Sequence, residues 1–187
     1  MEGGFLADIH LMRHGHYVGH HPGYHAPDDA ELSPRGQRDS SAAAQHLPAV
    51  AAIVSSPLPR ALQTAEILAE RSGVPLVKVI PDLREWRSPT AVQGLPPDEF
   101  PEDYAQWRVR RPLAPTSRYG DGESLKELSE RAACARAKLS SFVDREGSLL
   151  VVSHKLFLSL LTSTEPAAVA FSTAARSPWS FLEIRHR

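Results

Sequence analysis

Short apolar segments alternate with helical segments along this chain of 187 residues, and this alternation limits the folds that it can adopt. The apolar segments are typical of buried strands and comprise residues 9–12, 51–54, 76–80 and 149–152. Strands that alternate with helices pair in parallel, because each helix returns the chain across one face of the sheet. The sequence therefore predicts an α/β fold, a three-layer α/β/α sandwich with a mostly parallel central sheet.

Two helices have clear start signals. Ser33 followed by Pro34 combines an N-cap residue with a proline at the first helical position, and predicts a helix as far as Leu47. Pro59 begins the next predicted helix, which ends at Gly73. Each of these helices leads into the next predicted strand, as an α/β fold requires.

A third start signal lies in the C-terminal half. Residues 124–127 have the S-x-x-E form of a capping box. Apolar residues behind it recur at spacings of three and four, which places them on one helix face: Leu125, Leu128, Ala132, Ala135, Leu139 and Phe142. Shorter helices are expected over residues 102–110 and after His154, and a last strand over residues 179–184.

The composition indicates an ordinary soluble protein. The chain is 42% hydrophobic and 23% charged, and its length suits a single domain, residues 1–187. A formal net charge of −1 gives no general attraction to nucleic acid or to an anionic membrane. The longest apolar stretch, residues 149–161, contains polar residues and is too short to span a bilayer. Since no signal-peptide pattern is present and Cys134 is the only cysteine, we expect a cytoplasmic protein.

Residues that can carry chemistry follow the predicted strands. Arg13 and His14 follow the first strand, and Arg60 begins the helix after the second. Glu85 lies just beyond the third strand, and His154 follows the fourth. Each of these residues alone is more often a capping, solvated or core residue. Because the carboxyl ends of parallel strands meet at one edge of a sheet, however, we expect all five to lie close together.

Such a set of side chains suits a tetrahedral anion. Two guanidinium groups bind phosphate oxygens in bidentate fashion and stay charged. An imidazole in the same pocket can attack phosphorus, and a nearby carboxylic acid can protonate the leaving oxygen. The predicted chemistry is therefore phosphoryl transfer.

Six short motifs occur in the order typical of one enzyme family. They are LMRHG at residues 11–15, LSPRG at 32–36, SSPLPRALQTA at 55–65, LRE at 83–85, GES at 122–124 and VVSH at 151–154. Over nearly its whole length the chain thus resembles the histidine phosphatase superfamily, also called the phosphoglycerate mutase-like superfamily, in its larger branch. That branch contains the cofactor-dependent mutases and many small phosphatases.

The resemblance implies a role for each residue at the predicted edge. His14 would be the nucleophile that becomes phosphorylated, and Arg13 and Arg60 would hold the phosphoryl oxygens. His154 would stabilise charge on the phosphoryl group in the transition state. Glu85 would act first as general acid and then as the base that activates water. The resemblance implies neither a metal nor a cofactor.

The chain departs from the family pattern at two candidate binding residues. His20 stands where the family often has an asparagine near the phosphate, and we expect it to donate a hydrogen bond to the substrate. Lys155 follows His154, where the family commonly has glycine. Either its ammonium or only its backbone N–H faces the substrate, and the second is slightly favoured.

Four histidines lie within ten residues, namely His16, His20, His21 and His25. They suggest either a metal site or a loop that covers the substrate. No cysteine is nearby, and Pro22 and Gly23 favour a loop, so we expect no metal there. Histidines in such a loop would make phosphate binding depend on pH at about 6 to 7.

The proline-rich segment 81–122 has few strand signals. It includes a predicted lid, about residues 86–122, where the family inserts a segment that determines substrate specificity. Tyr104 and Trp107 are expected to pack the lid helix onto the body of the protein. The arginines of the lid either form a solvated face or meet a second anionic group of the substrate: Arg87, Arg108, Arg110 and Arg111.

The favoured function is a metal-independent phosphatase that acts on a small phosphomonoester. Phosphoglycerate mutase-type transfer is the nearest alternative, but mutases have a fuller E-R-H-Y-G pattern where Glu85 is here followed by WRSP. A phosphoprotein phosphatase is a further alternative, although the moderate lid favours a small substrate. A non-catalytic phosphate-binding protein would need neither nucleophile nor acid. Family members occur as monomers, dimers and tetramers, so a homodimer is one expected assembly.

Overall fold

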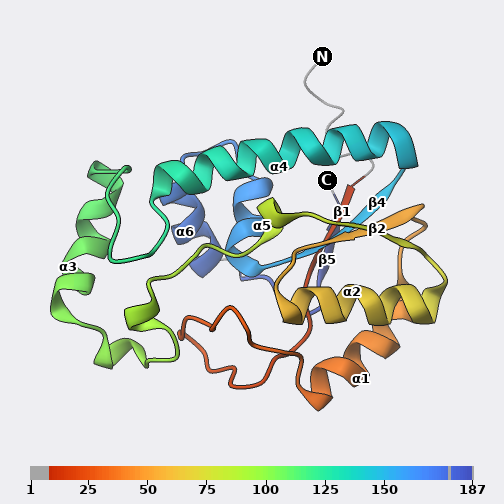
Figure 1. The fold of residues 1–187 in the computed structure, drawn as a ribbon, viewed down its shortest axis with the longest axis horizontal. Helices are drawn as coiled ribbons and strands as arrows, with labels where there is room; N and C mark the ends of the chain where they lie inside the picture. Colours follow the sequence, from red (N-terminus) through yellow and green to blue (C-terminus); the bar gives the residue numbers. More distant parts are fainter. Residues whose placement is uncertain (1–8, 177, 187) are drawn as a thin grey trace.

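The computed structural model describes residues 9–176 and 178–186, and its centre is a five-stranded sheet of order β3-β2-β4-β1-β5 (Figure 1). Four strands are parallel, and the edge strand β5 is antiparallel to its neighbour β1. The strands are β1 (Ile9–Arg13), β2 (Ala52–Ser55), β3 (Leu76–Val79), β4 (Leu149–Ser153) and β5 (Ile184–His186). The predicted mostly parallel sheet is confirmed, because each of the four apolar segments forms a parallel strand.

Helices cover both faces of the sheet (Figure 1). In chain order they are α1 (Pro34–Ala43), α2 (Pro59–Ser72), α3 (Glu102–Arg110), α4 (Leu125–Glu146), α5 (Lys155–Leu161) and α6 (Ala167–Arg176). Strand side chains alternate between the faces, so Leu11 of β1 packs into the core with α4, α5 and α6, whereas Met12 packs into the core with α2. This alternation produces the three layers that the sequence predicts.

The predicted helix starts are confirmed by their capping bonds. Ser33 Oγ accepts a hydrogen bond from Gly36 N at 3.1 Å. Ser124 Oγ accepts from Glu127 N at 3.2 Å, while the Glu127 carboxylate accepts from Ser124 N at 3.0 Å, so the capping box is complete. Helix α2 is followed by Gly73, whose φ of 78° is the left-handed conformation that glycine adopts at low cost.

The last strand differs from the predicted one. The sequence predicts a strand over residues 179–184, but β5 begins only at Ile184. Leu182 has a positive φ of 59°, and its N–H donates to Arg13 O at 2.9 Å, so the chain turns here instead of extending. Trp179 is buried in the core, which shows that a turn rather than a strand buries the apolar residues of this segment.

The segment 81–122 forms α3 and several short 3-10 turns, and Figure 1 shows α3 at one end of the molecule. Helix α3 spans the predicted residues. Trp107 is half-buried and packs against the main core, while Tyr104 is fully buried, as expected for a lid helix that packs on the body of the protein. None of the helices within residues 9–176 and 178–186 is long and apolar enough to cross a membrane.

Candidate active site

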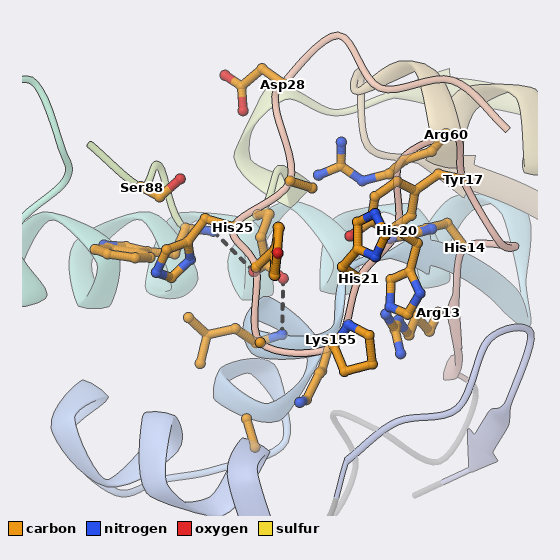
Figure 2. Close-up of a pocket in the computed structure, with 18 of the residues that line it drawn as sticks. Arg13, His14, Tyr17, His20, His21, His25, Asp28, Arg60, Ser88 and Lys155 are labelled. Atoms are coloured by element: carbon orange, nitrogen blue, oxygen red, sulfur yellow. Dashed lines mark hydrogen bonds between the residues drawn. The ribbon is translucent and has the colours of Figure 1, made fainter. Parts of the chain in front are cut away.

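A cavity of about 420 Å³ lies at the carboxyl ends of β1 and β4 (Figure 2). Six of the seven predicted site residues line it: Arg13, His14, His20, Arg60, Glu85 and Lys155. The seventh, His154, lies directly beside it, with its ring centroid 5.0 Å from that of His14. The structure therefore brings every predicted site residue together at one sheet edge.

His14 lies just past the end of β1, where its backbone N–H donates to Ser153 O at 3.0 Å. The side chain is buried, and Nδ1 lies 2.7 Å from Gly15 O. Because a carbonyl oxygen can only accept, Nδ1 carries the hydrogen and Nε2 keeps its lone pair. Burial, and then the charges of Arg60 and Arg13, hold the pKa of His14 well below its usual range. The imidazole is therefore neutral, which is the nucleophilic form.

Gly15 allows this strand end to pack tightly against α1 and α2. A Cβ at Gly15 would lie 3.0 Å from Ser40 Oγ and 3.2 Å from Gly36 O. The Gly15 N–H donates to Thr64 Oγ at 3.0 Å, and Thr64 Oγ in turn donates to Arg60 O at 2.7 Å. The RHG motif is thus joined by hydrogen bonds to the helix that carries Arg60.

Arg13 and Arg60 are both held by neutral groups. Arg60 is 2% exposed, and its Nη1 donates to Pro27 O at 3.0 Å. Arg13 Nη1 donates to Trp179 O at 2.6 Å. The Nε atoms of both arginines are buried and have no hydrogen-bond partner among the described residues. Because neither arginine forms an ion pair with another described residue, both retain charge and donors for an anion.

His154 is the N-cap residue of α5 and is fully buried. Its Nε2 lies 2.7 Å from Ser56 Oγ, which already accepts a hydrogen bond from Leu58 N at 3.3 Å. Leu58 N and His154 Nε2 are the only partners of this buried hydroxyl among the described residues, so its hydrogen finds an acceptor only at Nε2, and the ring hydrogen of His154 then lies on Nδ1. Nδ1 is buried and unpartnered within the described residues. Burial, and then the charge of Arg60, keep the pKa of His154 well below its usual range, so this ring is neutral too.

Glu85 is anchored rather than solvated. Its carboxylate accepts hydrogen bonds from the backbone N–H groups of Trp86 at 2.9 Å, Phe157 at 3.0 Å and Leu156 at 3.1 Å. Two of these donors belong to the first turn of α5, immediately after His154. The acid is therefore fixed beside the cavity by the same helix that begins at the second histidine.

Arg131 of α4 holds the segment that carries Glu85. The Arg131 guanidinium donates to the backbone oxygens of Asp82, Arg84 and Glu85 and forms a two-bonded ion pair with Glu123, at 2.7 and 2.8 Å. Sequence reasoning missed Arg131, although the GES motif contains its partner Glu123. No pattern in the sequence indicates that α4 lies against residues 82–85, and only the fold shows this contact.

His20 and Lys155 both line the cavity, so each stays a candidate for substrate binding. Burial, followed by the charge of Arg13, lowers the pKa of both side chains. Tyr17 also lines the cavity, with its ring 5.7 Å from that of His14 and 5.4 Å from the Arg60 guanidinium carbon. Tyr17 was not predicted as a site residue, although its place three residues after His14 was a signal that could have found it.

The loop histidines have separate surroundings. His16 Nδ1 lies 2.8 Å from Ser33 Oγ, and His25 Nε2 lies 3.1 Å from the Tyr104 hydroxyl. Within the described residues no three His, Cys, Asp or Glu side chains form a group that could hold a metal ion. Burial lowers the pKa of His16 and His20, and that of His25 to about 4. The pKa of His25 therefore lies below the expected range of about 6 to 7, and burial shifts the pKa of His16 and His20 in the same direction.

Comparison with known families agrees with this geometry. Residues 9–168 match the model of the histidine phosphatase superfamily (branch 1). The chain belongs to this superfamily. The match includes all seven site residues and stops within α6, so the predicted resemblance is confirmed.

Individual relatives include both mutases and phosphatases. The "Probable phosphoglycerate mutase GpmB" of Yersinia pestis (strain Pestoides F) is 30% identical over 165 residues, which cover 85% of this chain and 74% of the relative. A solved mycobacterial glucosyl-3-phosphoglycerate phosphatase is 28% identical, with a TM-score of 0.67 over 88% of this chain and 82% of that chain. The alpha-ribazole phosphatase of Shigella flexneri, 22% identical, has the same fold, with a TM-score of 0.72 over 88% of this chain and 83% of that chain.

Proposed function

We propose that the protein is a phosphatase that hydrolyses a small phosphomonoester through a phosphohistidine at His14, without a metal ion. The observation that carries this proposal is the neutral imidazole of His14, whose Nε2 has no partner among the described residues, beside the equally unpartnered Nε–H groups of Arg13 and Arg60. The similarity to the solved mycobacterial glucosyl-3-phosphoglycerate phosphatase supports the proposal. The cavity volume of about 420 Å³ is suited to a small ligand.

In the first half-reaction His14 Nε2 attacks phosphorus, so that an N–P bond forms and the ester P–O bond breaks. The two guanidinium groups and the Nδ1–H of His154 stabilise negative charge on the phosphoryl oxygens. To act as the general acid in this step, Glu85 carries a proton taken from solvent. Glu85 then gives this proton to the leaving oxygen, and the alcohol departs.

In the second half-reaction Glu85, now ionised, takes a proton from a water molecule. The oxygen of that water attacks phosphorus, the N–P bond breaks, and phosphate is released. His14 returns to its neutral form with the Nδ1 hydrogen still held by Gly15 O. The net change is hydrolysis of one P–O bond.

Mutase-type transfer is the second candidate, and the name of the curated relatives favours it. It would share the first half-reaction, but a second hydroxyl of the substrate would accept the phosphoryl group in place of water. The WRSP residues after Glu85, in place of the mutase pattern, favour water as acceptor.

A second cavity supports a proposal about the substrate. It has a volume of about 240 Å³ and shares His25, Trp86 and Phe171 with the catalytic cavity. Its walls include Arg108 and Arg111, which form no ion pair with any described residue, and contain no Asp or Glu. Arg111 is 9% exposed, and its Nη1 is buried without a partner. The favoured substrate therefore carries a second anionic group beyond the phosphate.

The first test is hydrolysis of para-nitrophenyl phosphate with a chelator present, by the wild type and by His14→Ala. We expect turnover by the wild type and a loss of at least about a thousandfold in the variant. His46→Ala is the matched control, because His46 is exposed and lies outside the cavity. Equal activity of His14→Ala and wild type would refute the mechanism. Isomerisation of a phosphoglycerate without release of phosphate would favour the mutase.

A further inference from the structure

The turn after α6 reaches the catalytic arginine Arg13 from the far end of the chain. Trp179 O accepts the hydrogen bond from Arg13 Nη1 at 2.6 Å, and Leu182 N donates to Arg13 O at 2.9 Å. Between them, the Phe181 ring lies under the guanidinium, with its centroid 4.0 Å from the central carbon. The backbone and the side chain of Arg13 are therefore both held by one turn, residues 179–182.

Phe181 is also surrounded by other rings of the site. Its centroid lies 4.9 Å from that of His20 and 5.9 Å from that of His14. These contacts fix the plane of the ring, and the ring in turn limits the rotation of the guanidinium above it. Phe181 does not line the catalytic cavity, so it supports Arg13 from outside it.

The turn of residues 179–182 is stabilised by contacts with Glu183 and Arg185. Glu183 accepts a hydrogen bond from Ser180 N at 2.7 Å and pairs with Arg185 at 2.6 Å. The Arg185 guanidinium carbon lies 4.2 Å from the centroid of the Trp179 ring, which is itself buried. The position of Phe181 is thus determined by a network of contacts within the turn.

The groups that hold Arg13 are uncharged. A carboxylate partner would fix the guanidinium equally well but would neutralise much of the charge that attracts a phosphate. A carbonyl oxygen and an aromatic face orient the guanidinium without forming an ion pair. They leave Nε, which is buried and unpartnered among the described residues, as a free donor.

We propose that Phe181 is a positioning residue that orients the Arg13 guanidinium for binding of the phosphoryl group. This inference rests on the proposed role of Arg13 in phosphate binding. It assigns a function to the turn between α6 and β5, which lies beyond residues 9–168 matched by the family model.

The test measures binding of inorganic phosphate and the kinetics of para-nitrophenyl phosphate hydrolysis in a double-mutant cycle of Phe181→Leu and Arg13→Gln. We expect Phe181→Leu to weaken phosphate binding and to raise KM by about three- to tenfold, because the cation–π contact is lost. In the Arg13→Gln background the same change should have almost no effect. Phe181→Tyr, which keeps the aromatic face, should restore wild-type binding.

A loss of phosphate affinity that is equal in both backgrounds would overturn the inference, since Phe181 would then act independently of Arg13. An unchanged affinity in Phe181→Leu would overturn it as well.

Phe142→Leu, on α4 and outside the cavity, is the control for loss of an aromatic ring. Should Phe181→Leu fail to fold, Glu183→Gln loosens the turn with the ring retained, and it should also weaken phosphate binding. If Arg13→Gln alone binds phosphate as tightly as the wild type, the proposed role of Arg13 fails instead.

Discussion

At the scale of single residues, the site depends on where two imidazole hydrogens lie. Gly15 O fixes the hydrogen of His14 on Nδ1, and the Ser56 hydroxyl fixes that of His154 on Nδ1 as well. The two rings consequently have opposite tasks. Under the proposed mechanism, His14 would present a lone pair to phosphorus, whereas His154 would present an N–H to a phosphoryl oxygen.

This assignment predicts a specific effect of Ser56→Ala. The change leaves His154 Nε2 buried without a partner and removes the bond that selects the tautomer, so kcat should fall by about tenfold or more. Ser55→Ala is the matched control, because Ser55 is equally buried but donates to Ser56 O and not to a site histidine. Steady-state kinetics of both variants checks the prediction. Equal losses in the two variants would contradict it.

Motifs in the sequence predict the residues proposed to bind the phosphate, because each motif is local. They did not reveal Tyr17, Arg131 or Phe181. Each of these residues contacts a partner far away in the chain: Tyr17 lies against Arg60, Arg131 against Glu85, and Phe181 against Arg13. Local pattern contains no information about such pairings, so only the folded structure identifies them.

At the scale of elements, the strands and capped helices follow directly from the sequence. A buried parallel strand such as β4 is a continuous apolar run, and the capping box of α4 is readable from four residues. The predicted range of the last strand was wrong. Edge strand β5 has only three residues, and the residues before it, which include Trp179 and Phe181, form a turn. Composition alone does not separate a buried turn from a strand.

The predicted lid around α3 gives a prediction about substrate selection. The test uses a series of hydroxy acids of increasing length, each phosphorylated on its hydroxyl group, and the matching carboxamides, which lack the negative charge. At the best length the acid should be hydrolysed with a kcat/KM about tenfold higher than that of its carboxamide. Arg108→Gln and Arg111→Gln should reduce this ratio toward one while activity on the carboxamides persists. Arg110→Gln is the control, since Arg110 bonds to Gln106 and does not line the second cavity. A ratio near one in the wild type would refute the second anion site.

At the scale of the whole molecule, residues from both ends of the chain meet at one place. The sheet order β3-β2-β4-β1-β5 puts the first strand between the fourth and the last, so Arg13, His154 and the turn that holds Arg13 become neighbours. Helix α4 then fixes Glu85 from the opposite side through Arg131. The fold thus assembles the proposed phosphate site and its support from residues that lie up to 166 positions apart.

The most direct test of this account is the identification of the covalent intermediate. The enzyme, mixed with substrate, is quenched in base, because a phosphorylated histidine is unstable in acid, and the peptides are examined by mass spectrometry. With para-nitrophenyl phosphate, whose phenolate leaves without help from an acid, the account predicts one phosphoryl group on His14, at Nε2, and more of it in Glu85→Gln, which removes the base for the second half-reaction. Turnover without phosphorylation of His14, or phosphorylation of another residue, would contradict it.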